Sequence, residues 1–231
     1  MSEKIVITSA KRTAVGSLSK SLKNIPAYEL GASAIREVIK KSNLKNDDID
    51  EVIMGQVLTG GMGQNPARQA AIKSGIPKEK PAYVVNQVCG SGIRSVVSGF
   101  QSIKSKDAKI IIAGGQENMS LAPHSIFLRD GKKLGNIEMT DTMIKDGLWD
   151  AFHEYHMGVT AENVATKFHV TREEQDKFAL KSQDKALKAQ SEKKFNEEII
   201  NFKIKSSKIE IDFNKDEHPR EGINIESLKR L

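Results

Sequence analysis

A continuous apolar run, Lys109–Gly115, most constrains what this chain can fold into. It contains three consecutive isoleucines and ends in two glycines, so a strand formed here has no polar face and must be covered on both sides. Strands of this kind lie in parallel or mixed sheets between layers of helices. The run therefore predicts a layered α/β core, which we expect to end near Asn118.

Strand and helix patterns alternate ahead of this run, as such a core requires. Segments rich in β-branched residues predict strands at Ile5–Thr8, Glu51–Gly55 and Tyr83–Val88. Helices are expected between them, and the first opens at Pro26.

Two more helices have clear local signals. The second runs from Ala67 to Ser74, where Asn65 is the cap, Pro66 the first residue and Gly75 the stop. The third is amphipathic and follows Gly92, with apolar residues at helical spacing at Ile93, Val96, Val97 and Phe100.

The pattern changes after Asn118. Residues 119–150 are rich in Met, Gly and Asp and keep no period, so we expect loops and short helices there. From Thr160 the pattern is helical. We therefore divide the chain into an α/β core, residues 1–118, and a loop domain, residues 119–231.

The loop domain gives three specific expectations. Thr171 and Glu174 form a capping box at the start of a helix. Four apolar residues are expected on the buried side of that helix: Phe178, Leu180, Ala186 and Leu187. The segment Asn196–Phe213 then alternates, which predicts strands around a turn at Ser206-Ser207.

Composition argues against several classes of protein. One cysteine cannot form an intrachain disulfide or a cysteine-based zinc cluster, so we expect a cytoplasmic protein without a structural metal. The net charge of +6 comes from lysines interleaved with acids, which argues against a nucleic-acid partner. We expect no signal peptide, and no run approaches the ~18 apolar residues of a membrane span.

The only cysteine, Cys89, lies where the predicted strand Tyr83–Val88 gives way to a helix. Free N–H groups and the positive end of the helix dipole gather at such a point and favour the thiolate, the reactive form of cysteine. Gly90 and Gly92 leave room for a ligand to approach the backbone, whose amides could bind an oxyanion. A lone cysteine is more often an inert buried residue, but this setting predicts a nucleophile.

Three segments in order resemble the signatures of thiolases: Val88–Gly92, Gly114–Ser120 and Tyr155–Asn163. The chain looks most like the biosynthetic acetyl-CoA acetyltransferase branch, because Arg129–Gly135 resembles the loop by which those enzymes form tetramers. The likeness runs from Ile5 to Leu231. It implies a thiolase-like layered α/β core, a βαβαβα mixed sheet, with an inserted CoA-binding loop domain.

The resemblance also implies a chemistry that fits Cys89. The matching cysteine of thiolases attacks an acyl-CoA thioester and carries the acyl group, and a second acetyl-CoA then condenses with it to give acetoacetyl-CoA and CoA. The reverse reaction is thiolysis. Coenzyme A thioesters are thus the expected substrates, with no permanently bound cofactor, and a role in fatty acid metabolism is implied.

Five residues match the family's CoA-binding positions. The resemblance places Leu148, His156 and Met157 along the pantetheine and acyl region, and Arg220 and Ser227 at the nucleotide end. Arg220 also fits on chemical grounds, because a guanidinium stacks on a base and pairs with phosphate. His153 and His156 have a spacing that could bind a metal, but no carboxylate and histidine partners accompany them, and we expect no metal site.

The chain departs from the family in one respect. Thiolases continue into a second α/β half that supplies a Gly-His-Pro segment and a second cysteine, and we find neither. We therefore expect a truncated chain that lacks the base for condensation, or one that a second chain completes. Two alternatives stay open: a degradative 3-ketoacyl-CoA thiolase, and a non-catalytic acyl-CoA-binding or assembly remnant.

Overall fold

The structure is a computed structural model that describes residues 4–206 and 209–231. Its centre is a three-stranded parallel sheet in which β1 lies between β2 and β3. The strands are β1 (Glu51–Gly55), β2 (Ala82–Val85) and β3 (Ile111–Gly115). All three predicted strands are confirmed: the prediction Glu51–Gly55 coincides with β1, whereas Tyr83–Val88 and Lys109–Gly115 differ from β2 and β3 by up to three residues at an end.

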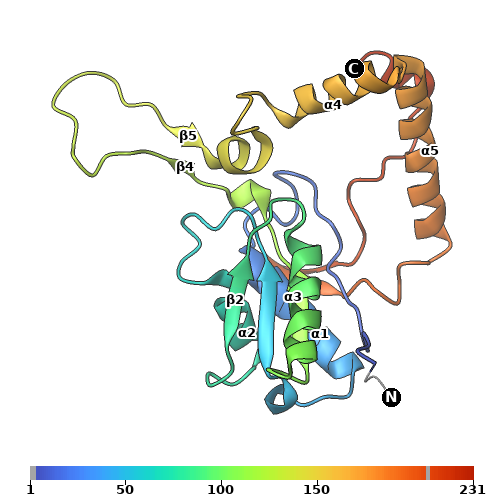
Figure 1. The fold of residues 1–231 in the computed structure, drawn as a ribbon. Helices are drawn as coiled ribbons and strands as arrows, with labels where there is room; N and C mark the ends of the chain where they lie inside the picture. Colours follow the sequence, from blue (N-terminus) through green and yellow to red (C-terminus); the bar gives the residue numbers. More distant parts are fainter. Residues whose placement is uncertain (1–3, 207–208) are drawn as a thin grey trace.

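Helices cover both faces of this sheet (Figure 1). They are α1 (Ala27–Lys41), α2 (Pro66–Ser74) and α3 (Ser91–Ser105), with a short 3-10 helix, η1 (Asn46–Asp48), before β1. α1 and α2 form a buried cluster with Val52 and Met54 of β1, while Gly99 of α3 lies against Ile111 on the opposite face. The predicted layered α/β core is thereby confirmed.

The predicted ends of α2 are also confirmed. The side chain of Asn65 accepts a hydrogen bond from the backbone N–H of Arg68 at 3.1 Å, and Pro66 is the first helical residue. Gly75 ends the helix with a φ of 95°, a conformation that costs glycine little. Local chemistry therefore sets both ends of this helix.

The amphipathic helix α3 is oriented unusually. Its buried residues are small, namely Ser91, Ser95 and Gly99, and they let the helix lie close to the sheet. Most of the apolar stripe faces outward instead: Ile93 is 69% exposed and Phe100 is 47% exposed, whereas Val96 is partly buried. Apolar periodicity thus located the helix correctly but marks the side turned away from the sheet.

The prediction of a strand at Ile5–Thr8 is wrong. These residues form no strand, and the side chains of Val6 and Ile7 are exposed. β-Branched residues favour a strand only where a neighbouring strand supplies hydrogen-bond partners, and none of the described residues pairs with this segment.

Short elements follow β3, as expected for residues 119–150. They are η2 (Met119–Leu121), β4 (His124–Ser125), β5 (Thr140–Asp141) and a π-helix, η3 (Met143–Leu148). Between β4 and β5 the chain makes a long excursion away from the sheet (Figure 1), and Phe127 and Leu134 are almost fully exposed on it. The segment Arg129–Gly135 lies within this excursion.

Two helices come next, α4 (Met157–Phe168) and α5 (Arg172–Ser191). The capping box is confirmed, since the backbone N–H of Thr171 donates to Glu174 at 2.8 Å and the N–H of Glu174 donates back to the Thr171 hydroxyl at 3.2 Å. The expected burial of Phe178 is wrong, because it is 76% exposed, whereas Leu180, Ala186 and Leu187 are partly buried. None of the described helices combines the length and the apolar character that a membrane crossing needs.

The C-terminal part of the chain then packs against the N-terminal segment. The strands β6 (Phe202–Ser206) and β7 (Ile209–Phe213) form the expected antiparallel hairpin, whose predicted turn at Ser206-Ser207 lies partly outside the described residues. A short helix, α6 (Ile225–Leu228), follows near the end of the chain. Phe213 packs with Ala14, Leu22 and Leu30 in a second buried cluster.

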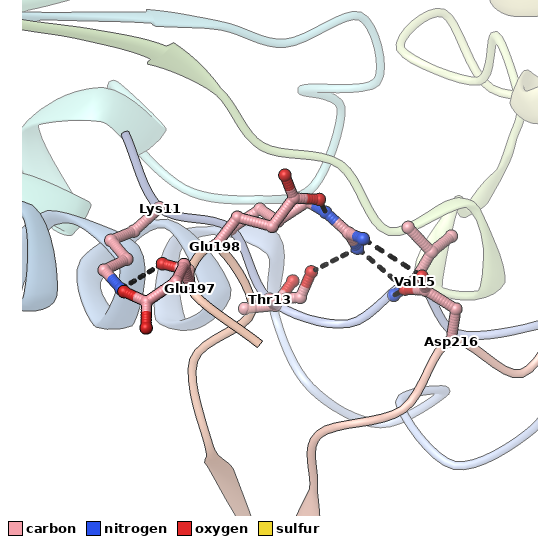
Figure 2. Close-up of polar contacts among 7 residues, drawn as sticks. Lys11, Thr13, Val15, Glu197, Glu198 and Asp216 are labelled. Atoms are coloured by element: carbon pink, nitrogen blue, oxygen red, sulfur yellow. Dashed lines mark hydrogen bonds and ion pairs between the residues drawn. The ribbon is translucent and has the colours of Figure 1, made fainter. Parts of the chain in front are cut away.

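Polar contacts hold this return segment in place (Figure 2). The guanidinium of Arg12 donates to Glu198 at 2.7 Å and to both carboxylate oxygens of Asp216 at 2.7 and 3.0 Å. Asp216 also accepts from the backbone N–H of Val15 at 2.7 Å. One arginine therefore joins the N-terminal segment to the chain on both sides of the hairpin.

Candidate functional site

Cys89 lies in a tight turn between β2 and α3, so its predicted place at a strand-to-helix junction is confirmed. The backbone N–H of Gly90 donates to the carbonyl of Gln87 at 3.0 Å, and the N–H of Ser91 donates to the carbonyl of Val88 at 3.0 Å. The side chain of Cys89 is exposed and in no disulfide. A thiol in this position is accessible to a ligand at the start of a helix.

The residue before the cysteine is strained. Val88 has a φ of 46°, in the left-handed region that β-branched residues avoid. Such a conformation costs on the order of 1–3 kcal/mol and persists only where the surroundings hold it. Here the side chain of Asn86 accepts from the N–H of Val88 at 2.9 Å, and the hydroxyl of Ser91 donates to the carbonyl of Val88 at 2.6 Å.

Glycines at the ends of two strands let this turn sit close to the sheet. A Cβ at Gly55, the last residue of β1, would lie 2.4 Å from the carbonyl carbon of Ser91 and 2.6 Å from the nitrogen of Gly92. At Gly115, the last residue of β3, a Cβ would lie 3.4 Å from the Cα of Gly92. The start of α3 therefore rests on the carboxyl ends of β1 and β3, where parallel α/β sheets commonly bind ligands.

A half-buried carboxylate, Glu117, fixes the loop that follows β1. Its two oxygens accept from the backbone N–H groups of Val57 and Leu58 at 2.8 and 3.2 Å. Burial raises the pKa of Glu117, and the two hydrogen bonds only partly oppose that rise. No sequence pattern marks Glu117 by itself, although it lies in the thiolase-like segment Gly114–Ser120.

Two buried amides, Gln56 and Gln116, directly precede Val57 and Glu117 in the chain. The side chain of Gln116 donates to that of Gln56 at 2.9 Å, and Gln56 donates to the carbonyl of Leu58 at 3.0 Å. Gln116 lies close to α1, where a Cβ at Gly31 would meet its oxygen at 2.0 Å. These contacts link α1 to the loop after β1, and no local sequence signal pointed to them.

The structure brings Leu148, His156 and Met157 into one region. Leu148 ends η3, and the next residue, Trp149, forms a β-bridge with His156. The ring Nδ1 of His156 accepts from the N–H of Gly158 at 3.0 Å and so caps α4, which begins at Met157. An open pocket of about 570 Å³ beside this region is lined by Thr140, Asp141, Ile144, Lys145, Trp149 and Glu154.

His153 has a separate set of contacts. Its Nδ1 lies 3.3 Å from Asp150, and its ring stacks on Tyr155 with the ring centroids 5.6 Å apart. Among residues 4–206 and 209–231, no group of three or more His, Cys, Asp and Glu side chains is arranged to hold a metal ion.

Arg220 and the short helix α6, which contains Ser227, both contact α5. The backbone N–H of Arg220 donates to Gln183 of α5 at 3.0 Å, and its side chain is exposed. Ser227 lies in α6, where its hydroxyl donates to the carbonyl of Asn224 at 2.7 Å. The end of α6 accepts from Arg172, the first residue of α5, through the carbonyl of Leu228 at 2.7 Å.

Comparisons with known proteins agree over nearly the whole chain. The thiolase N-terminal domain matches residues 5–231. The acetyl-CoA acetyltransferase of Rhizobium meliloti is 54% identical over 98% of this chain and 58% of its own length. The cytosolic acetyl-CoA acetyltransferase of Rattus norvegicus is 46% identical over 100% of this chain and 58% of its own.

A solved structure gives the same result for the fold. The crystal structure of the Bacillus anthracis acetyl-CoA acetyltransferase matches with a TM-score of 0.94 at 36% identity, covering 98% of this chain and 57% of that one. This chain thus spans less than two thirds of the length of these relatives. Sequence and fold together place the chain in the thiolase family.

Proposed function

We propose that this protein condenses two acetyl-CoA molecules to acetoacetyl-CoA and CoA, or catalyses the reverse thiolysis, through an acetyl group carried on Cys89. One observation carries the proposal. An exposed cysteine stands at a strained strand-to-helix turn in a chain that is 46% to 54% identical to proteins named acetyl-CoA acetyltransferase. The identity of those relatives suggests the substrate, and the turn suggests the nucleophile.

In the first step the thiolate of Cys89 attacks the carbonyl carbon of acetyl-CoA. The bond between that carbon and the CoA sulfur breaks, and CoA leaves as a thiolate that takes up a proton. Backbone N–H groups at a helix start are suited to stabilise the oxyanion that forms in between. The product is acetyl-Cys89 and free CoA.

In the second step a base removes a proton from the methyl group of another acetyl-CoA. The carbanion attacks the carbonyl carbon of acetyl-Cys89, the bond to the cysteine sulfur breaks, and the thiolate is restored. We assign this base to no residue of the 231-residue chain. We propose instead that it comes from a further polypeptide segment that completes the site.

The remaining assignments follow from the same proposal. Leu148, His156 and Met157 would contact pantetheine and the acyl group, and the exposed Arg220 and Ser227 would hold the nucleotide. The exposed apolar excursion between β4 and β5 supports assembly into a tetramer. The cytosolic relative from rat supports a cytoplasmic location.

The decisive experiment is the intact mass of the purified protein before and after incubation with acetyl-CoA. We expect one added acetyl group in the wild type and none in Cys89→Ser, because a serine hydroxyl is not ionised near neutral pH. Absence of the added mass in the wild type would contradict acyl transfer by this chain and favour a binding or assembly remnant. Wild-type and Cys89→Ser proteins that are acetylated equally would show that another residue is modified.

A second measurement separates the two enzyme readings. Once acetylation is established, and with the completing segment present, the rate with acetoacetyl-CoA is compared with that of a long-chain 3-ketoacyl-CoA in the presence of CoA. A faster reaction with acetoacetyl-CoA supports the acetyltransferase, and a faster reaction with the long chain would replace it by a degradative thiolase.

A further inference from the structure

The hydroxyl of Ser91 makes two hydrogen bonds, and both go to the turn that presents Cys89. It accepts from the backbone N–H of Gln87 at 2.8 Å and donates to the carbonyl of Val88 at 2.6 Å. The backbone N–H of Ser91 donates to the same carbonyl at 3.0 Å. The first residue of α3 is thus tied to the two residues that directly precede the cysteine.

These bonds act on a conformation that valine does not adopt by preference. The φ of 46° at Val88 is unfavourable for a β-branched residue, so the turn relaxes if its constraints are removed. The simplest relaxation is rotation of Val88 towards negative φ. Because Cys89 is the next residue, that rotation carries its thiol away from the start of α3.

Asn86 supplies a second constraint, but a weaker one. Its side chain accepts from the N–H of Val88 at 2.9 Å, yet Asn86 is exposed, so water can replace the lost acceptor. Ser91 is only 4% exposed. The hydrogen bonds of its hydroxyl to Gln87 and Val88 are partly buried, whereas the bond of Asn86 to Val88 is exposed, so water replaces the Ser91 hydroxyl less readily.

We infer that Ser91 is a positioning residue for the nucleophile, whose hydroxyl fixes the strained turn at Val88 and so aims Cys89 at the acyl group. This inference rests on the proposed acyl transfer through Cys89. Ser91 touches no reacting atom in this scheme and acts only through the backbone before the cysteine.

Ser95 is a closely matched control on the same helix. It lies one turn further along the buried side of α3 and is 0% exposed. Its hydroxyl lies 2.7 Å from the carbonyl oxygens of both Gly92 and Gly114, so it contacts the helix and β3. Ser95→Ala therefore removes a buried serine hydroxyl from the same face and leaves the bonds between Ser91 and the turn intact.

The test follows acetylation of Cys89 by acetyl-CoA over time, by intact mass, together with the melting temperature of each variant. We expect Ser91→Ala to slow acetylation by about 10- to 100-fold, because misplacing a reacting group by about 1 Å has effects of this size. Ser95→Ala should lower the melting temperature but keep nearly the wild-type rate. Ser91→Thr keeps the hydroxyl and should restore most of the rate.

Two results would overturn the inference. One is equal slowing by Ser91→Ala and Ser95→Ala, which would reduce the role of Ser91 to stability. The other is a Ser91→Thr variant that recovers the melting temperature without recovering the rate.

Alkylation of Cys89 by iodoacetamide, which needs no acetyl-CoA, is measured in parallel. It should also be slower in Ser91→Ala than in Ser95→Ala. The alkylation rates of the two variants can differ in this way even if the wild-type protein is never acetylated. In that case the proposed function fails, while the positioning role of Ser91 is supported.

Discussion

Arg12 and Asp216 are 204 residues apart in the chain, and they meet through two hydrogen bonds of 2.7 and 3.0 Å. The guanidinium fork matches the carboxylate, and Glu198 occupies a third N–H of the same arginine at 2.7 Å. The Arg12 side chain is 32% exposed and that of Asp216 is 13% exposed, so the pair is partly shielded from water. It is a polar link between the N-terminal segment and the chain on both sides of the β6–β7 hairpin.

Arg12→Lys should destabilise the protein although it keeps the charge. A lysine ammonium cannot bond both oxygens of Asp216 and Glu198 in the same fork geometry, and we expect a loss of about 2 kcal/mol in the free energy of unfolding. Urea unfolding measures this loss. The control is Lys41→Ala, which breaks an exposed ion pair with Glu197 at 3.7 Å and should cost about 0–1 kcal/mol. Equal losses in the two variants would contradict the assigned role of Arg12.

The stabilisation that Asp216 provides should depend on pH. Burial acts to raise the pKa of Asp216, but the hydrogen bonds from Arg12 and from the N–H of Val15 outweigh it, and the net shift is downward from 3.8. A depressed pKa means that the stabilisation is present above the ordinary value and is lost as the pH falls through the folded-state pKa. The stability difference between wild type and Asp216→Asn should therefore shrink in acid, which unfolding curves at decreasing pH measure.

The contribution of Glu117 to stability should change with pH in the opposite direction to that of Asp216. Its pKa is raised by burial, although the hydrogen bonds from the N–H groups of Val57 and Leu58 act to lower it. Its contribution to folding stability is therefore greatest below pH 4.5 and declines as the pH rises through the folded-state pKa. The stability difference between wild type and Glu117→Gln should thus fall as the pH rises above 4.5 and through the raised folded-state pKa. A difference that grows over this range would show that the hydrogen bonds, rather than burial, dominate.

Gly55→Ala should displace the start of α3. The added Cβ would lie 2.4 Å from the backbone of Ser91, so either β1 or the helix must move, at a cost of about 1–3 kcal/mol. We expect slower acetylation of Cys89 together with a lower melting temperature. Gly60→Ala is the control, because a Cβ there has no atom within 4 Å. An unchanged acetylation rate in Gly55→Ala would mean that the turn tolerates a shift of the helix.

Local signals predicted the core elements well. Asn65, Pro66 and Gly75 mark the ends of α2 by their own backbone chemistry, and the run Lys109–Gly115 needed only its apolar composition to be recognised as a buried strand. The strand expected at Ile5–Thr8 failed because a strand also needs a partner, and a partner is not a local property. The burial expected for Phe178 failed in a similar way, since a helix pattern cannot say which face finds a neighbour.

The candidate site was predicted in part. The sequence placed Cys89 correctly at the helix start, because strand and helix patterns meet there. The strain at Val88 and the two hydrogen bonds of the Ser91 hydroxyl depend on backbone angles, and no pattern of residue types encodes those angles. Glu117 bonds N–H groups about 60 residues earlier in the chain, which is again a long-range relation. The roles of Leu148, His156, Met157, Arg220 and Ser227 stay predictions.

Three residues of the apolar stripe on α3, Ile93, Val97 and Phe100, lie outside the buried contact between that helix and the sheet. The buried residues of the helix are Ser91, Ser95 and Gly99, whereas these three are exposed. The two sides can therefore be redesigned separately. Charged residues introduced along the stripe would change the solubility of the protein, or provide points for labels and surface attachment, while the seat of the nucleophile on the sheet stays as it is.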